Sequence, residues 1–423
     1  MKRFLVLLYL LISTVSLKSQ NFKVLFIGNS YTAVNNLPLT VSNIATSFGD
    51  TLTYDSNTPG GYTFNLHTSN VTTLSKINAQ VWDFVVLQEQ SQLPSFDPTQ
   101  VDVDVYPYAR KLDSLILAND SCTETFFYMT WGRQNGDLSN CAAYPPVCTY
   151  NGMQQRLRDS YMEMSVNNHG SVSPVGVAWK NIRDNYPGIN LYQADESHPS
   201  VHGTYLAACV FYSSLFHKST VGSSFISSGI SAADALAIQT IASSTVLDSM
   251  MLWQGNGDVP IANFNYTSVG STIQFINTSS NSLNYSWNFG DGNIATTTAP
   301  QNTYLVDGQY LVTLTASSNC LSYTFTDTLF INSTDVSNDE KNSSFDFSPN
   351  PVQGDFYISF AGKSYSNINL LIYNSLGQVV SNKNYKDVIM IHESIGELNA
   401  GLYTLILYSE NNQIGTKKMI VGN

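Results

Sequence analysis

Hydrophobic and polar positions follow three successive patterns along the chain. Between residues 21 and 252, short apolar runs alternate with amphipathic stretches. The runs have the composition of buried strands: KVLFIG, DFVVLQ, ETFFYMTW, SVSPVGVAW and INLYQAD. The stretches between them have the apolar spacing of helices, as in YPYARKLDSLILAND and QQRLRDSYMEMSVNNHG. Strands that alternate with helices predict an α/β domain with a parallel sheet.

The pattern changes after residue 255. Short alternating apolar and polar runs, separated by turn residues, extend over 263–333 and predict a small antiparallel β-sandwich. A polar stretch then predicts a linker over 334–344. A second series of alternating runs, 345–423, predicts another small all-β domain.

The first residues have the pattern of a secretory signal peptide. Lys2 and Arg3 precede the apolar stretch FLVLLYLLISTVS, and Ser19 after it is a small residue suited to the position before a cut. The stretch is too short and too close to the N-terminus for a transmembrane helix. We therefore expect a signal peptide over 1–19, with cleavage between Ser16 and Gln20, and no transmembrane anchor.

Composition agrees with an exported, β-rich protein. The 423 residues suffice for about three domains. Charged residues make up only 12%, against the usual ~25%. The net charge of −12 argues against nucleic acid or an anionic membrane as the main partner.

The five cysteines indicate at least one disulfide. Cys141 and Cys148 lie seven positions apart in a loop-like stretch, and export permits a bridge between them. Cys122 and Cys320 have no obvious partners, and Cys209 lies in an apolar stretch that suggests the core. No His or Cys cluster has metal-ligand spacing, so we expect neither a metal nor another cofactor.

The first candidate catalytic residue is Ser30, in the stretch FIGNSYT at the end of the first apolar run. A plain strand-to-helix turn is one interpretation, since Gly and Asn tolerate turns and Ser caps helices. The other is a nucleophile, which needs a base to take its proton. Asp195 and His198 are three residues apart, a spacing that one helical turn places on the same face. His202 is a rival base.

An acyl-transfer site also needs hydrogen-bond donors for the oxyanion. The backbone N–H of Ser30 is one, and Gly60 or Gly61 lets a second backbone N–H approach a substrate. Gln88 or Gln90, after the run DFVVL, offers a side-chain amide as the third. We expect Glu89 between them to be solvated or hydrogen-bonded rather than catalytic.

The order of these motifs resembles that of the SGNH (GDSL-like) hydrolases: GNS, then GG, then the Gln cluster, then D-x-x-H-P. The resemblance spans about 230 residues and implies a flavodoxin-like three-layer α/β/α fold. It implies that Ser30 is the nucleophile, that Asp195 and His198 complete a triad, and that Gly60 or Gly61 lines the oxyanion hole. No metal is required by this chemistry.

Two positions depart from that family. Asn29 stands where Asp is common, and Gln88-Glu89-Gln90-Ser91 replaces the family's Gly-x-Asn-Asp pattern. Carbohydrate-acetyl esterases of the superfamily carry a Gln at the equivalent place, which favours Gln88 as the third donor with Gln90 in reserve. Tyr62 and Arg133 are candidates for the substrate groove; for Trp131, core packing is the favoured interpretation.

The stretch YSWNFGDGNIATTTAPQNTYLVDGQYLVTLTA resembles a PKD-type immunoglobulin-like domain. The resemblance implies that Trp287 fills the core and that Gly290–Gly292 forms a turn, which we expect Asp291 to cap rather than to bind calcium. Its role in such proteins is that of a spacer or of a contact with carbohydrate or protein. We favour the spacer.

The last 80 residues resemble a type IX secretion C-terminal sorting domain, through FSPNPVQGDFYISF, LLIYNSLGQVV, ELNAGLYTLILYS and KKMIV. The resemblance implies the type IX secretion machinery as a partner and export across both membranes of a Gram-negative cell. Removal of the domain would follow a cut in or near Ser333–Ser344, with release or surface attachment afterwards.

Together these features predict a secreted serine esterase that hydrolyses an ester on an acylated glycan, most simply an acetyl group. A lipase or thioesterase is the rival within the enzyme class. The alternative from another class is a cell-surface binding protein or adhesin built on a degenerate SGNH scaffold. The complete Ser30, Asp195 and His198 set favours the enzyme.

Overall fold

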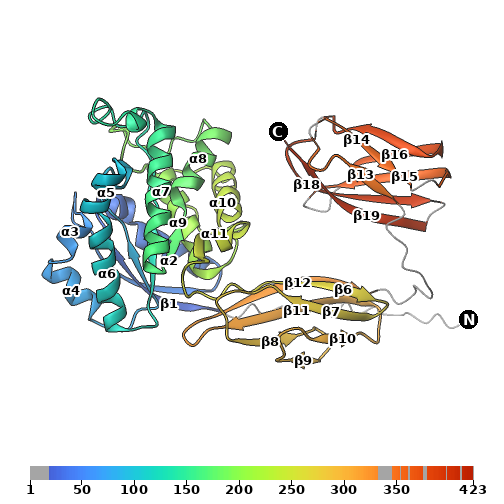
Figure 1. The fold of residues 1–423 in the computed structure, drawn as a ribbon, viewed down its shortest axis with the longest axis horizontal. Coiled ribbons are helices and arrows are strands. Elements are labelled where there is room, and N and C mark those ends of the chain that lie inside the picture. Colours follow the sequence, from blue (N-terminus) through green and yellow to red (C-terminus); the bar gives the residue numbers. More distant parts are fainter. Residues whose placement is uncertain are drawn as a thin grey trace, which may run out of the picture. The chain divides into compact units, whose positions relative to one another are not determined.

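The computed structural model describes residues 19–331, 345–352, 354–360, 363–374, 379–396, 398–409 and 412–422. The expected signal peptide, apart from Ser19, and the expected linker over 334–344 lie outside the described residues. The chain divides into two compact units, Met1–Ser333 and Thr334–Asn423. Figure 1 shows the elements of each unit along the sequence.

The α/β domain (residues 21–254) is built on a five-stranded parallel sheet in the order β2-β1-β3-β4-β5. Its strands are β1 (Asn21–Ile27), β2 (Thr51–Asn57), β3 (Phe84–Leu87), β4 (Glu124–Tyr128) and β5 (Ser171–Ser173). This order is that of the flavodoxin-like doubly wound folds. The expected α/β class is confirmed.

Helices cover both faces of the sheet (Figure 1). One face packs against α2 (Leu37–Ser47), α8 (Val175–Asn185), α9 (Val201–Phe216) and α10 (Ala232–Leu247). The other packs against α3 (Phe64–His67), α4 (Val71–Ile77), α5 (Pro98–Asp104), α6 (Tyr106–Asn119), α7 (Tyr150–Asn168) and α11 (Met250–Gln254). The short helix α1 (Ser30–Ala33) follows β1 directly.

Successive strand residues enter the two cores in turn. In β1, Val24 and Phe26 belong to one hydrophobic cluster, whereas Leu25 and Ile27 belong to the other. All four are fully buried. A strand covered on both faces has no solvent side, which is why these strands are continuous apolar runs rather than alternating ones.

One strand prediction was too long, one was wrong, and one strand was missed. The run SVSPVGVAW is a strand only over Ser171–Ser173, because Pro174 cannot donate to the sheet and α8 begins at Val175. Residues 189–195 contain only an isolated bridge, between Tyr192 and Pro199. The edge strand β2 was missed, because its sequence TLTYDSN is mostly polar.

The first β domain (residues 264–331) has two antiparallel sheets, β10-β7-β6 and β12-β11-β8-β9. Its strands are β6 (Phe264–Val269), β7 (Thr272–Asn277), β8 (Asn284–Asn288), β9 (Ile294–Ala295), β10 (Gln301–Thr303), β11 (Gly308–Ser317) and β12 (Ser322–Ile331). Trp287 is fully buried in its core, as expected. The carboxylate of Asp291 accepts hydrogen bonds from the backbone N–H of Asn293 and from the side chain of Asn302. Asp291 therefore caps the turn.

The first β domain is anchored to the α/β domain rather than only tethered to it. Tyr323 of β12 is part of the α/β domain's hydrophobic core. Its hydroxyl donates to the Leu215 carbonyl at 2.6 Å, and its ring stacks on His217 with 3.8 Å between centroids. Asn281 donates to the Gly257 carbonyl at 2.8 Å. These contacts fix one end of the first β domain to the α/β domain.

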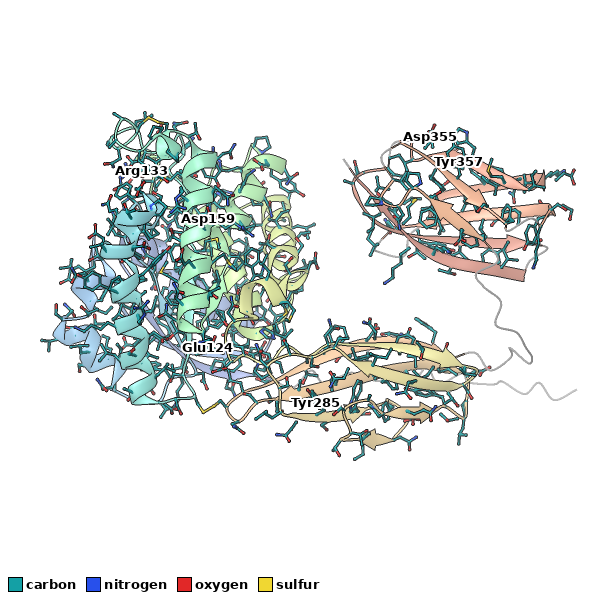
Figure 2. The ribbon with its side chains drawn as sticks, in the orientation of Figure 1. Glu124, Arg133, Asp159, Tyr285, Asp355 and Tyr357 are labelled. Carbon is teal, nitrogen blue, oxygen red and sulfur yellow. A yellow bond between two sulfur atoms is a disulfide. The ribbon has the colours of Figure 1, made fainter. Side chains whose placement is uncertain are left out.

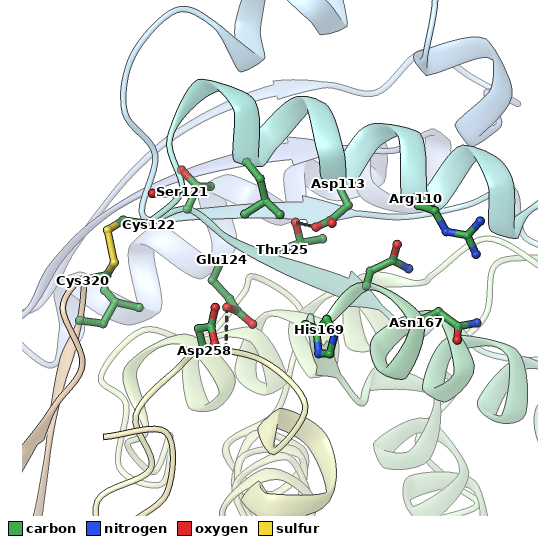
Figure 3. Close-up of a pocket in the computed structure, with 14 residues that line it drawn as sticks. Arg110, Asp113, Ser121, Cys122, Glu124, Thr125, Asn167, His169, Asp258 and Cys320 are labelled. Carbon is green, nitrogen blue, oxygen red and sulfur yellow. Dashed lines mark hydrogen bonds between the residues drawn. A yellow bond between two sulfur atoms is a disulfide. The ribbon is translucent and has the colours of Figure 1, made fainter. Parts of the chain in front are cut away.

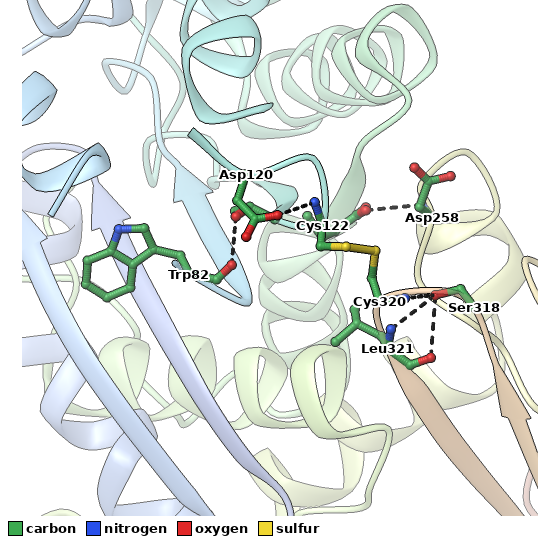
Figure 4. Close-up of a disulfide and its surroundings, with 9 residues drawn as sticks. Trp82, Asp120, Cys122, Asp258, Ser318, Cys320 and Leu321 are labelled. Atoms are coloured by element: carbon green, nitrogen blue, oxygen red, sulfur yellow. Dashed lines mark hydrogen bonds between the residues drawn. A yellow bond between two sulfur atoms is a disulfide. The ribbon is translucent and has the colours of Figure 1, made fainter. Parts of the chain in front are cut away.

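A disulfide between Cys122 and Cys320 strengthens this anchorage (Figure 4). The two residues are 198 positions apart, so their pairing had no signal in the sequence and the expectation that they lack partners was wrong. The Cys141–Cys148 bridge is present, and Cys209 is a free, buried cysteine. Burial raises the pKa of the Cys209 thiol to about 12, which leaves it unreactive.

The second β domain (residues 345–422) also has two antiparallel sheets, β13-β14-β17 and β16-β15-β18-β19. Its strands are β13 (Asp346–Ser348), β14 (Asp355–Ser359), β15 (Tyr365–Tyr373), β16 (Val379–Val388), β17 (Met390–Ser394), β18 (Gly401–Ser409) and β19 (Asn412–Val421). Phe356, Leu370 and Leu405 lie in its core. The two all-β sandwiches expected after the α/β domain are therefore confirmed.

The two disulfides close loops of very different length, which predicts different contributions to stability. On the loop-entropy account, replacing Cys122 and Cys320 by Ser lowers the free energy of unfolding by about 5 kcal/mol, and replacing Cys141 and Cys148 by about 2 kcal/mol. Urea unfolding of the full chain measures both. Equal losses from the two double variants would contradict the anchoring role.

Candidate active site

Ser30 lies at the carboxyl end of β1, as the first residue of α1. Asn29 is the N-cap of this helix, and its side chain accepts from the Tyr31 N–H at 3.1 Å. A Cβ on Gly28 would lie 2.7 Å from Gln88 Oε1 and 2.8 Å from Thr32 Oγ1. Glycine is therefore required where β1 turns sharply into the helix.

Ser30, His198 and Asp195 form a continuous hydrogen-bonded chain. His198 Nε2 lies 2.9 Å from Ser30 Oγ, and His198 Nδ1 bonds to the Asp195 carboxylate. Because an ionised carboxylate only accepts, Nδ1 carries the proton and the lone pair of Nε2 faces the serine hydroxyl. The arrangement has the roles of a nucleophile, a base and an orienting carboxylate.

The triad is open to solvent. The side chains of His198 and Asp195 are 31% and 47% exposed. Partial burial pushes the pKa of Asp195 upward, but hydrogen bonds from the His198 side chain and from the His198 and Ser197 N–H groups outweigh it. The pKa of Asp195 is therefore below its ordinary value, and the carboxylate stays ionised at neutral pH.

The Asp195–His198 pair arises from a turn, not from the helical turn that the spacing suggested. Asp195 Oδ1 accepts from the backbone N–H groups of Ser197 and His198 at 3.1 and 3.0 Å. Glu196 between them has a φ of +60°. The side chain of Asp195 thus folds its own loop and leaves Oδ2 for the imidazole, an arrangement typical of Asx turns.

An aromatic stack holds this loop against the nucleophile. Tyr31 stacks on Trp131 with 4.7 Å between centroids, and Trp131 stacks on Trp179 at 3.8 Å. The Tyr31 hydroxyl lies 2.6 Å from Ser197 Oγ, and Trp131 Nε1 donates to the Ser197 carbonyl at 3.0 Å. Trp131 is fully buried, in agreement with the core-packing interpretation.

Three further residues singled out from the sequence, His202, Arg133 and Tyr62, make contacts with residues other than Ser30, His198 and Asp195. His202, the rival base, is on α9 and pairs with Asp234 of α10 at 3.4 Å. Arg133 is partly exposed and lies 3.6 Å from Asp137. The hydroxyl of Tyr62 accepts from Asn70 at 3.3 Å, and its ring packs against His67.

Gly60 and Gly61 form an exposed turn after β2, in which Gly61 has a φ of +71°. The loop is tied to the nucleophile, because Asn29 Nδ2 donates to the Tyr62 carbonyl at 3.0 Å. Ser30 N–H is the first in α1 and so has no intrahelical acceptor. These backbone groups remain our predicted oxyanion donors.

The prediction that Gln88 donates to the oxyanion is wrong. Its side chain is fully buried; Oε1 accepts from Asn29 N–H at 2.9 Å, and Nε2 donates to the Glu89 carbonyl. Gln90, the reserve, bonds within its own loop, where Oε1 accepts from Gln92 N–H at 2.7 Å and Nε2 donates to Gln92 Oε1 at 3.3 Å. The Gln88 amide thus holds the backbone at Asn29, and the Gln90 amide holds its own loop.

Two buried polar side chains behind the site escaped the sequence reading. His67 Nε2 lies 2.9 Å from the Gly28 carbonyl, and its Nδ1 lies 2.8 Å from Thr73 Oγ1. Burial lowers the pKa of His67, so the ring is neutral and donates through Nε2. Glu89 is fully buried and hydrogen-bonded, so the second of the two alternatives expected for it, solvated or hydrogen-bonded, is confirmed. The only signal for Glu89 was its place directly after an apolar strand.

The Asn29 departure has a structural reason. Its amide uses both ends, since the oxygen caps α1 and the nitrogen holds the Tyr62 carbonyl. An aspartate could cap the helix but could not donate. Asn29 is therefore suited to joining the loops after β1 and β2.

A cavity of about 360 Å³ lies at the other edge of the sheet (Figure 3). Its lining includes Glu124 at the start of β4, Asp113, His169 and the Cys122–Cys320 region. Glu124 and Arg133 lie toward opposite ends of the α/β domain (Figure 2). This cavity is thus separate from the Ser30 site.

Two features are absent from the described part of the chain. No group of three or more His, Cys, Asp or Glu residues there is arranged to hold a metal ion. No helix in the same residues is long and apolar enough to cross a membrane.

Two family models match parts of the chain. Residues 260–332 match the PKD domain, and residues 347–422 match the secretion system C-terminal sorting domain. Both resemblances are thereby confirmed. The second match supports secretion or a position at the cell surface. No curated protein has a sequence that matches this chain.

Solved structures similar to the α/β domain include a DUF4886 family protein from Bacteroides uniformis, with 20% identity, a TM-score of 0.47, and coverage of 54% of this chain and 95% of that one. A candidate SGNH hydrolase from Slackia heliotrinireducens has 23% identity, a TM-score of 0.38, and coverage of 45% and 97%. An acetyl xylan esterase has 13% identity, a TM-score of 0.34, and coverage of 46% and 100%. None of these likenesses assigns an activity to this chain.

Because the Asn29 side chain both accepts from the Tyr31 N–H and donates to the Tyr62 carbonyl, we predict that Asn29→Asp destabilises the protein. A carboxylate oxygen would face the Tyr62 carbonyl, and the free energy of unfolding should fall by about 1–3 kcal/mol in urea titrations. Asn70→Asp is the matched control, because the N-cap Asn70 donates only to a hydroxyl, which can rotate. Equal stability of Asn29→Asp and the wild type would contradict the role.

Buried carboxyls predict a pH dependence of stability. Burial raises the pKa of Glu89 from 4.5 to about 8, so the folded state holds this proton more tightly than the unfolded state. Its contribution to the free energy of unfolding is present below about pH 4.5 and is lost as the pH rises through 8. Between pH 5 and 8, the wild type should lose about 2–4 kcal/mol more than Glu89→Gln in urea titrations. Burial also raises the pKa of Glu124, to about 7, and this carboxyl group makes stability fall with pH in the same way. Because Glu124 is present in both proteins, the difference between them reports Glu89 alone. Identical pH profiles would show that Glu89 does not titrate there.

Proposed function

We propose that the protein is a serine hydrolase that cleaves carboxylic esters through Ser30. The observation that carries this proposal is the chain from Ser30 Oγ to His198 Nε2 at 2.9 Å and from His198 Nδ1 to Asp195. These groups come from two loops 168 residues apart in sequence. A scaffold that served only for binding would not need all three groups in this order.

The geometry supports a two-step acyl transfer. His198 Nε2 takes the proton of Ser30 while Oγ forms a bond to the ester carbonyl carbon, and the carbonyl oxygen becomes the oxyanion. The backbone N–H of Ser30, with that of Gly60 or Gly61, would stabilise this charge. The C–O bond to the alcohol then breaks, and His198 returns the proton to the leaving oxygen. Water, deprotonated by His198, releases the carboxylic acid and restores Ser30.

For the substrate, we propose an acylated glycan and an acetyl group as the acyl part. The triad is open, with nearly half of the Asp195 side chain exposed, which suits a bulky alcohol component. Polar, solvent-accessible side chains lie on the His198 loop and on the loop after β4, including Glu196, Arg133 and Asn135; Asn135 donates to the Glu196 carboxylate and joins the two loops. Such groups match sugar hydroxyls better than a long acyl chain.

The sorting domain supports the idea that this substrate is met outside the cell. We propose that the type IX secretion machinery exports the chain, and that cleavage near 333–344 separates the second β domain from the unit that contains Ser30. The first β domain, which is anchored to the α/β domain, would remain with it.

The first experiment is ester hydrolysis by the purified full chain. We expect turnover of p-nitrophenyl acetate, slower turnover of p-nitrophenyl octanoate, and release of acetate from acetylated xylan. Ser30→Ala should lower kcat for the acetate ester by at least about 10³-fold, and a fluorophosphonate probe should label Ser30 in the wild type alone.

His202→Gln is the matched control, since His202 pairs with Asp234 and not with Ser30. It should retain the activity of the wild type. No turnover and no labelling of the folded wild type would overturn the hydrolase and favour the binding protein. Octanoate preferred over acetate would overturn the acetyl assignment alone.

A further inference from the structure

The carboxyl group of Glu89 connects two loops at the back of the site. It lies directly after β3 and is fully buried. Both of its oxygens lie 3.0 Å from the Phe64 backbone nitrogen and accept from that N–H. Oε1 also accepts from the Gln90 N–H at 2.6 Å. The side chain thus joins the loop after β2 to the loop after β3.

Phe64 places this contact close to the predicted oxyanion donors. It is the first residue of α3, and Tyr62, whose carbonyl accepts from Asn29, is two residues before it. Gly60 and Gly61 belong to the same short loop. The loop is therefore held at one point by the residue beside the nucleophile and at another by Glu89.

The surroundings of Glu89 contain hydrogen-bond donors rather than a cation. Within the described residues, no ion pair includes Glu89. The hydroxyl of Tyr161 on α7 accepts from the Glu89 N–H, and His67 of α3 bonds to the Gly28 carbonyl behind the same site. Burial raises the pKa of Tyr161 and lowers the pKa of His67, so both are neutral. What Glu89 does here thus depends on whether its side chain is long enough for its oxygens to contact the Phe64 and Gln90 N–H groups.

We propose that Glu89 is a positioning residue, which fixes the Gly60–Tyr62 loop through the Phe64 N–H and so aims the backbone donors at the oxyanion formed at Ser30. This inference rests on the proposed hydrolase. Glu89 itself touches neither the substrate nor the reacting atoms. Loss of its contact should weaken binding of the transition state more than binding of the substrate.

Two conservative variants separate the reach of the side chain from its ability to titrate. Glu89→Asp keeps a carboxyl group but withdraws it by one methylene group, whereas Glu89→Gln keeps an oxygen at full reach and cannot titrate. For p-nitrophenyl acetate we expect Glu89→Asp to lower kcat by about 10²-fold with KM within about threefold, and Glu89→Gln to stay within about fivefold of the wild type. Fluorophosphonate labelling should slow in the same order.

Glu124→Asp is the matched control. Glu124 is also a buried carboxylate that accepts a backbone N–H, that of Asp258, but it lies at the opposite edge of the sheet. Its shortening should leave kcat unchanged. Equal kcat for Glu89→Asp and the wild type, or an equal loss in Glu124→Asp, would overturn the proposal.

Amide hydrogen exchange tests the positioning without any turnover. Exchange in the peptide that contains Phe64 should accelerate at least about tenfold in Glu89→Asp but not in Glu124→Asp. Unchanged exchange would overturn the positioning role. If the wild type hydrolyses no ester, the hydrolase proposal fails while this measurement still decides whether Glu89 holds the loop.

Discussion

The site depends on one close approach between neighbouring parallel strands. Ile27 of β1 pairs with Leu87 of β3, and the next residues, Gly28 and Gln88, come so near that no side chain fits between them. Gln88 Oε1 accepts from the Asn29 N–H and from the Thr32 hydroxyl. The turn that presents Ser30 is therefore held from the adjacent strand, and its direction follows from the register of the sheet.

The residues around Ser30 fall into two groups, one buried behind the site and one exposed to solvent in front of it. Gln88, Glu89 and His67 are fully buried, and their polar atoms bond to backbone groups of the loops after β1, β2 and β3. Buried polar groups are tolerated when they are paired in this way. His198 and Asp195 face solvent in front. Paired buried groups behind an exposed front would suit the proposed ester hydrolysis, in which fixed backbone donors stabilise the oxyanion.

The first β domain is attached at the edge of the sheet opposite the triad. The disulfide partner Cys122 comes just before β4 begins, while Ser30 follows the end of β1. Because the strands are parallel, their starts and ends lie at opposite edges. Tyr323 and the disulfide thus fix the first β domain where it leaves the approach to Ser30 free.

The sequence by itself determined the α/β class, the two β-sandwich domains and the pairing of Asp195 with His198, because these depend on apolar periodicity and on residues close in the chain. It also singled out Ser30 as a candidate, because the GNS stretch stands at the end of the first apolar run and Asp195 and His198 follow later in the chain in the order that the family resemblance implies. The tertiary structure alone decided the Cys122–Cys320 bridge, the anchoring by Tyr323 and the buried roles of Gln88 and Glu89. These join segments far apart in sequence, and a Gln or Glu after an apolar strand has the same local pattern whether it faces a substrate or the backbone behind it. Only the packing of β1 against β3, and of the loops that follow them, distinguishes the two.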